Sequence, residues 1–143
     1  MKFSATILFA AAASAAAIDK RDALFTVSDF EAGCIPHSSQ CQYSFGVLQK
    51  GTMETTPVKC SAMLTSNNSL PDVKEGEGKC EGSARTFTVT RGSDGLTLTV
   101  TQPVTPSSDQ SASHLIPNNQ ITKATQPNAE VESYTGDKSF DLN

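Results

Sequence analysis

Apolar and polar residues alternate along much of this sequence with a period of two. Three early rows have apolar residues at every second position, with mostly Thr, Ser, Gln, Lys or Gly between them. The apolar members are Phe25 and Val27 in the first row, Tyr43, Phe45 and Val47 in the second, and Val58, Cys60, Ala62 and Leu64 in the third. Because successive side chains of a strand point to opposite faces of a sheet, each row predicts a β-strand with one buried face.

The longest alternation, residues 85–102, predicts a β-hairpin. Two apolar rows alternate there with threonines, and Gly92 and Asp94-Gly95 supply residues that tolerate the positive φ of a hairpin turn. The hairpin would bury Phe87, Val89, Leu96 and Leu98. Its other face would expose the threonines at 86, 88, 90, 97, 99 and 101. These threonines could form a polar recognition face, but ordinary strand propensity is the favoured explanation.

After residue 17, no segment repeats its apolar residues with the 3.6-residue period of a helix. Further short strands are expected at Ser113–Ile116, Gln120–Thr125 and Glu130–Thr135. Polar breaks, which we interpret as loops, fall at residues 49–51, 65–71 and 73–82. The pattern predicts an all-β fold, a single-domain antiparallel β-sandwich or small β-barrel of about seven to nine short strands.

The N-terminal residues predict processing before the β domain begins. Residues 1–17 combine a short basic start, an apolar run and small residues at the end, as in a secretory signal peptide. Residues 18–21 form a short pro-segment that ends in the dibasic pair Lys20-Arg21. Residues 22–143 are then the single β domain. No later stretch approaches the roughly 20 apolar residues of a membrane span.

The net charge of the predicted mature chain limits the classes of partner that it is expected to bind. The chain has 11 basic and 15 acidic residues. Without Lys2, Lys20, Arg21 and Asp19 these become 8 and 14, a net charge of −6. Phosphate neutralisation by basic side chains drives nucleic-acid binding, so this acidic chain is not expected to bind nucleic acid.

Four cysteines follow the predicted signal peptide: Cys34, Cys41, Cys60 and Cys80. An even count in an oxidising secretory route predicts two disulfides that staple the small domain. Three pairings are open, and the sequential one, Cys34–Cys41 with Cys60–Cys80, is favoured because residues 35–40 form a turn-prone insert. A zinc site with His37 between Cys34 and Cys41 lacks the paired short spacings of structural zinc sites. We expect no metal site.

Candidate catalytic chemistry is sparse. The two histidines, His37 and His114, have no nucleophile elbow in the sequence to act with. The acidic residues Asp72, Glu75, Glu77 and Glu81 match no defined calcium loop, and lysines lie among them, so a solvated loop is favoured. A pair of carboxylates for glycoside hydrolysis stays open, because their separation is a three-dimensional property. We predict no catalytic residue and no cofactor.

Asn67-Asn68-Ser69 is an N-glycosylation sequon within a polar segment. It predicts a surface loop with Asn67 as the acceptor for a glycan.

Three segments carry a resemblance to a known group: 25–30, the cysteine loop 34–41, and 43–45. With them the chain resembles the small secreted cysteine-containing proteins of filamentous ascomycetes. Within that group it is similar, along its whole length, to the hypersensitive response-inducing elicitors of plant pathogens such as the rice blast fungus. The resemblance implies an extracellular effector of the plant apoplast that triggers oxidative burst and hypersensitive cell death. It brings no catalytic motif, and it implies only a structural role for the four cysteines.

The resulting hypothesis is a monomeric secreted elicitor and virulence-related effector without enzyme activity. Its partner would be a plant cell-surface receptor or glycan, contacted through loops such as 34–41 and 65–82. Two alternatives stay open. One is a small β-barrel that binds an apolar ligand such as a lipid or phenolic compound, and the other is a secreted hydrolase.

Overall fold

A computed structural model describes residues 23–126 and 129–143 of the chain. The predicted signal peptide, the pro-segment and Asp22 lie outside the described residues. Ten strands and one short 3-10 turn follow in chain order. They are β1 (Phe25–Cys34), β2 (Gln40–Gln49), β3 (Val58–Thr65), β4 (Val73–Cys80), β5 (Thr86–Arg91), β6 (Gly95–Thr105), β7 (Ser108–Pro117), η2 (Asn118–Gln120), β8 (Ile121–Gln126), β9 (Ala129–Tyr134) and β10 (Phe140–Leu142).

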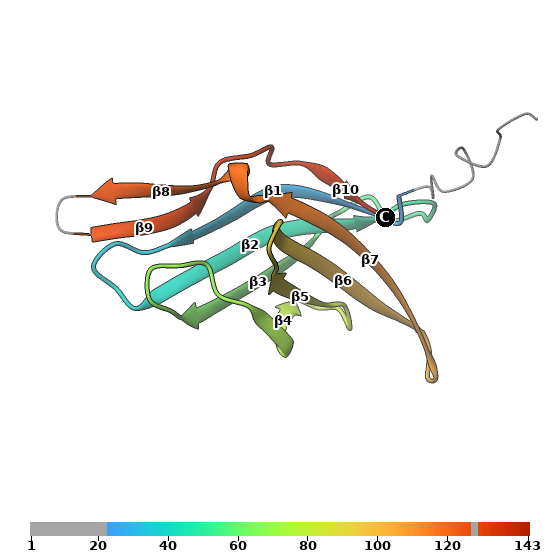
Figure 1. The fold of residues 1–143 in the computed structure, drawn as a ribbon. Helices are drawn as coiled ribbons and strands as arrows, with labels where there is room; N and C mark the ends of the chain where they lie inside the picture. Colours follow the sequence, from blue (N-terminus) through green and yellow to red (C-terminus); the bar gives the residue numbers. More distant parts are fainter. Residues whose placement is uncertain (1–22, 127–128) are drawn as a thin grey trace, which may run out of the picture.

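All ten strands belong to one antiparallel sheet that curls into a nearly closed barrel. Nine follow the order β7-β6-β5-β4-β3-β2-β1-β9-β8, and β10 pairs with β1 beside this path. The first half of β1 pairs with β10, whereas β9 meets β1 near its end, at Gly33. The β8–β9 hairpin therefore continues beyond the barrel wall, as Figure 1 shows. The predicted all-β class and small antiparallel barrel are confirmed.

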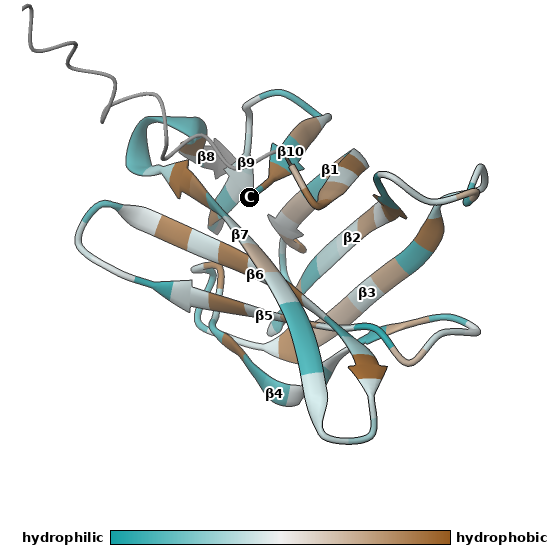
Figure 2. Ribbon diagram, turned by 90° about the vertical axis from the view of Figure 1, so that its right-hand side faces the viewer, coloured by the Kyte–Doolittle hydropathy of each residue, from teal (hydrophilic) through white to brown (hydrophobic). Residues whose placement is uncertain are grey.

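The core consists of the inward-facing side chains of the alternating rows. Figure 2 shows the strands arranged around this core, with brown and pale positions alternating along several of them. The largest fully buried residues include Phe25, Phe30, Tyr43, Phe87, Leu70, Leu96, Leu98, Ile116 and Leu142. The rings of Phe30, Phe45 and Phe87 follow one another with centroids 5.7 and 4.9 Å apart. Aromatic side chains thus fill the middle of the barrel.

The predicted hairpin over residues 85–102 is confirmed, and its predicted core residues Phe87, Val89, Leu96 and Leu98 are buried. Val89 pairs with Leu98 and Phe87 with Val100, and all four are buried. The threonines pair with one another on the outer face, where Thr88 lies opposite Thr99.

A β-bulge in β1 shifts the phase of its alternation. The pairing of β1 with β2 is interrupted between Ser28 and Glu31, and Asp29 adopts φ 52°. Before the bulge the buried residues are Phe25 and Val27; after it they are Phe30, Ala32 and Cys34. The extra residue of a bulge turns the next side chains to the opposite face. A strict two-residue period does not predict that change.

The prediction of a loop over residues 73–82 is wrong for most of its length. Val73–Cys80 form strand β4 although Gly and charged residues dominate the segment. β4 pairs with β5, and Gly78 lies so close to the ring and carbonyl oxygen of Phe87 that a side chain has no room there. Tertiary pairing outweighs weak strand propensity in this position.

Each end of the barrel is covered by one buried side chain from a connecting segment or strand start. At one end Leu70, from the β3–β4 loop, is 1% exposed. At the other end Arg85 is 5% exposed and lies 5.7 Å from the centroid of the Phe25 ring. The Arg85 guanidinium donates to Gln102 and Glu54 at 2.6 and 2.7 Å. A buried guanidinium is tolerated because hydrogen-bond acceptors surround it.

The structure contains two disulfides, Cys34–Cys41 and Cys60–Cys80, the sequential pairing. Each joins register partners on adjacent strands, β1 to β2 and β3 to β4. All four cysteines are buried. Across the described residues, the structure has no helix with the length and apolarity that a bilayer crossing requires.

Candidate recognition surface at the loop end of the barrel

Two loops that are far apart in the sequence meet at the end of the barrel covered by Leu70. The first, residues 35–39, joins β1 to β2, and the second, residues 66–72, joins β3 to β4. The Ser66 N–H donates to the Ser39 carbonyl at 2.8 Å. We call the surface formed by 35–39 and 66–69 the loop end. It brings together the two loops that the sequence analysis selected for recognition.

The first loop is held in shape by the Cys34–Cys41 disulfide directly beneath it. Inside the loop, the Ile35 N–H donates to the Gln40 carbonyl at 2.9 Å, and the Ser38 N–H donates to the Ile35 carbonyl at 3.2 Å. His37 has φ 60°, a left-handed conformation in which His is enriched relative to most residues. The imidazole is exposed. The loop therefore presents His37 from a fixed backbone.

The second loop is anchored to three strands. The Tyr43 hydroxyl donates to the Pro71 carbonyl at 2.7 Å. The Glu132 carboxylate accepts from the Leu70 N–H at 2.8 Å and from Arg91 at 2.7 Å. The Asn68 carbonyl accepts from the Glu132 N–H at 3.0 Å. Because these bonds reach β2, β5 and β9, the loop cannot move without breaking several of them.

Burial raises the pKa of Tyr43 well above its usual range, and nearby Arg91 only partly opposes this. Tyr43 thus stays protonated at ordinary pH and serves as a hydrogen-bond donor that positions the loop. It is a structural group, because its side chain is fully buried and its hydroxyl proton is already used.

A polar hollow lies between the two loops. Its volume is about 420 Å³, and its lining consists of His37, Ser38, Ser39, Ser66, Asn67, Asn68 and Glu130. Asn67 and Asn68 are both exposed, and Asn68 has φ 61°. The sequon asparagine therefore lies on the surface, as the sequence predicts, at the edge of this hollow. The hydroxyl, amide and imidazole groups that line the hollow can both donate and accept hydrogen bonds.

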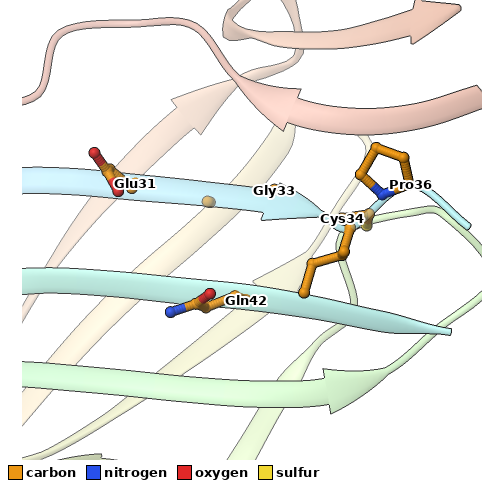
Figure 3. Close-up of a pocket in the computed structure, with 7 residues that line it drawn as sticks. Glu31, Gly33, Cys34, Pro36 and Gln42 are labelled. Carbon is orange, nitrogen blue, oxygen red and sulfur yellow. The ribbon is translucent and has the colours of Figure 1, made fainter. Parts of the chain in front are cut away.

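A second hollow of about 330 Å³ lies on the other side of the 35–39 loop, over the outer face of β1 and β2. Figure 3 shows Glu31 and Gln42 on these adjacent strands at one side of the hollow and Pro36 near Cys34 at the other. Gly33 lies between them and contributes no side chain, so the surface is hollowed there. Ile35, 39% exposed, adds an apolar edge.

The two histidines, His37 and His114, lie apart in the structure. His114 stacks on Phe140 with centroids 4.1 Å apart, and partial burial lowers its pKa. Phe140 pairs with Val27 near the start of β1, whereas His37 follows the end of β1, so the two histidines lie at opposite ends of that strand.

Of the acidic residues predicted in a loop, Glu75 and Glu77 lie on β4, whereas Asp72 precedes the strand and Glu81 follows it. Asp72 accepts from the Arg91 N–H at 2.8 Å, and Glu77 accepts from the Lys74 N–H at 2.9 Å. Within residues 23–126 and 129–143, no three His, Cys, Asp or Glu side chains are grouped so that they could hold a metal ion.

No family model, curated protein or solved structure matches the chain.

Sequence reasoning missed the residues that fix the loop end. Glu132, Arg91 and Leu70 act through contacts between segments 20 or more positions apart, and each looks ordinary in its own segment. One signal was present for Leu70, since it is a large apolar residue between polar neighbours and Pro71. Such a residue in a loop commonly marks an anchor point in the core.

Proposed function

We propose that the protein is a secreted effector that elicits plant defence, and that the loop end is the surface presented to a plant cell-surface receptor or glycan. The resemblance of segments 25–30, 34–41 and 43–45 to ascomycete elicitors supplies the biological class. The two disulfides fit a chain that folds in an oxidising compartment such as the secretory route.

One observation carries the choice of surface: both loops of the loop end are held in fixed conformations before any partner binds. The disulfide restrains the first loop, and the bonds from Tyr43 and Glu132 restrain the second. Binding by preformed loops costs less conformational entropy than binding by loops that must first become ordered. Exposed His37, Asn67 and Asn68 supply polar contacts, and half-exposed Ile35 supplies an apolar one.

The barrel interior disfavours the alternative of an apolar ligand carrier. Phe30, Phe45, Phe87 and Tyr43 fill the space that a lipid or phenolic compound would need. Leu70 and Arg85 cover the two ends. A ligand would have to displace packed aromatic side chains, which costs several kcal/mol for each large residue, on the order of 3–5.

The test is leaf infiltration with the purified mature protein, with hydrogen peroxide and cell death as the readouts. Intact protein is compared with protein that has been reduced and alkylated. A response to the intact form alone is expected, because alkylation removes the restraint on the 35–39 loop. A response to both forms would contradict recognition of a folded surface, and no response to either would reject the elicitor proposal.

A pair of surface variants locates the recognised face. Ile35→Ser combined with His37→Asn changes exposed side chains of the loop end and keeps at position 37 a residue type that tolerates positive φ. We expect this double variant to need at least a tenfold higher dose for the same response, which corresponds to a loss of about 1.4 kcal/mol of binding free energy. The matched control, Thr88→Ala with Thr99→Ala, changes two outward residues of the hairpin and should leave the dose response unchanged.

A further inference from the structure

A third hollow lies at the bulge of β1, away from the loop end. It has a volume of about 370 Å³ and is the least open of the hollows described. Three strands and one loop form it: Ser28 and Asp29 from β1, Ser44 and Gly46 from β2, Lys59 from β3, and Pro57 with Thr56 from the β2–β3 loop. The size is within the range of small-molecule sites in proteins.

Gly46 forms the floor of this hollow, within a row of paired residues that crosses three strands. Ser28 pairs with Gly46, and Gly46 pairs with Lys59. A methyl group at Gly46 would lie 3.0 Å from both the Pro57 Cβ and the Ser28 Oγ. The β2–β3 loop therefore folds closely over the missing side chain, and Pro57 gives the hollow an apolar wall.

The bulge places a carboxylate at the edge of the same hollow. Asp29 has φ 52° and interrupts the pairing of β1 with β2. Bulges recur beside functional sites because they redirect a side chain, and left-handed non-glycine residues are among the backbone outliers that cluster there. Since Asp29 is exposed, burial in the core does not account for this conformation.

The polar side chains around the hollow are free to bind a ligand. Among the residues that the structure describes, Ser28, Asp29, Ser44 and Lys59 have no side-chain hydrogen bond or ion pair. By contrast Glu31, two positions beyond Asp29, is engaged by Lys138 at 3.4 Å. Asp29 and Lys59 cancel in charge, and Ser28, Ser44 and Thr56 add three hydroxyls.

We infer that this hollow binds one residue of a neutral saccharide. A pyranose presents hydroxyls that both donate and accept, which matches a lining of hydroxyls with one carboxylate and one ammonium group. Its C–H face can pack on Pro57. The balanced charge gives an anionic or cationic ligand no net attraction, and hydrogen bonds to the charged groups of Asp29 and Lys59 are the stronger kind. This site is separate from the loop end, so the inference does not depend on the proposed function.

The experiment is an NMR titration of the mature protein with cellotetraose, laminaritetraose and chitotetraose in separate series, up to about 10 mM so that binding in the millimolar range is detected. We expect at least one sugar to shift the amide signals of residues 28–29, 44–46 and 56–59. No shift with any of the three, or shifts confined to other residues, would overturn the inference. A zwitterionic dipeptide that shifts these signals when no sugar does would also overturn it.

Variants tie the binding to the named groups. Asp29→Asn keeps a residue type that tolerates the left-handed conformation and should weaken binding about tenfold, as expected for loss of a hydrogen bond to a charged group. Ser44→Ala tests the site independently with a severalfold weakening, and both variants should keep the melting temperature close to wild type. Glu31→Gln, on the same strand outside the hollow, is the matched control and should bind as the wild type does. Unchanged affinity in both Asp29→Asn and Ser44→Ala would overturn the assignment.

Discussion

The backbones of Ser113 in β7 and Asn143 after β10 exchange two hydrogen bonds, with N–O distances of 3.0 and 3.1 Å. β10 also pairs with β1, so this short strand bridges the first and the seventh strands and nearly closes the barrel. Leu142 is fully buried directly beside this contact. Three residues of strand thus connect the β7 edge of the sheet to the first half of β1, which β9 does not pair.

We expect Leu142→Ala to lower the free energy of unfolding by about 2–5 kcal/mol, because it leaves a cavity where β10 meets the core. Chemical denaturation of the mature protein measures this loss. Leu115→Ala is the matched control, since Leu115 lies on β7 and is 47% exposed. It should change stability by less than about 1 kcal/mol. Equal losses in the two variants would show that β10 does not contribute to the core as described.

The ion pair at the Arg85 end gives a pH-dependent prediction. Glu54 lies 2.7 Å from the buried Arg85 guanidinium, and its hydrogen bond to Arg85 lowers its pKa from the ordinary value of 4.5. A carboxyl group with a lowered folded-state pKa stabilises the protein above its unfolded pKa. That contribution is lost as the pH falls from 4.5 through the lower folded-state value.

Glu54→Gln should therefore destabilise the protein at pH 7 by about 1–3 kcal/mol, since it leaves the Arg85 charge without its carboxylate. The same variant should lose less stability than the wild type between pH 5 and pH 3. Lys50→Gln removes an ion pair with Asp141 in which both side chains are more than 40% exposed, and serves as the control. Its effect should stay within about 0.5 kcal/mol. Parallel pH profiles for Glu54→Gln and wild type would refute the assigned role.

The strands with strict alternation were predictable from the sequence. The strands that the sequence did not predict were missed for local reasons. The rows around Tyr43, Phe87 and Leu98 became buried strand faces, because a two-residue period determines which side chains share a face. β4 was missed because its Gly and charged residues hide a strand whose pairing depends on Phe87. β10, only three residues long, is too short for any period to be visible.

The site was less predictable than the fold. The sequence predicted exposed loops within 34–41 and 65–82, of which 35–39 and 66–72 are loops in the structure. It did not predict that these two loops meet, which depends on the contact of Ser66 with Ser39. The bulge at Asp29 has no clear sequence signal, because Asp is also ordinary on the polar side of a strand. Contacts between distant segments and single backbone irregularities therefore define the polar hollow of the loop end and the hollow at the β1 bulge, and no local sequence pattern predicts either of them.

Glycosylation of Asn67 gives a further prediction, since the sequon lies at the edge of the polar hollow of the loop end. In protein secreted by a eukaryotic host, treatment with an N-glycosidase should reduce the intact mass by one glycan. Ser69→Ala should abolish that change, whereas Ser69→Thr keeps the sequon and should retain it. An unchanged mass for the wild type would contradict the prediction. An attached glycan would also cover the hollow, so the deglycosylated protein should elicit at a lower dose.

The two disulfides should separate stability from recognition. Their cysteines are 7 and 20 positions apart, so chain-entropy estimates give about 2.5 kcal/mol for Cys34–Cys41 and about 3.3 kcal/mol for Cys60–Cys80. Replacing Cys60 and Cys80 by Ala should therefore lower the free energy of unfolding more than replacing Cys34 and Cys41, as measured by urea denaturation.

The activity of the two double variants should follow the opposite order, because only Cys34–Cys41 restrains the 35–39 loop. Infiltrated well below its melting temperature, the variant lacking Cys60 and Cys80 should keep the cell-death response, and the variant lacking Cys34 and Cys41 should lose most of it. Circular dichroism establishes that both variants are folded at the infiltration temperature. If the loss of response instead tracks the loss of stability in the two variants, the disulfides act only by keeping the barrel folded. The shape of the 35–39 loop would then not be what the plant recognises.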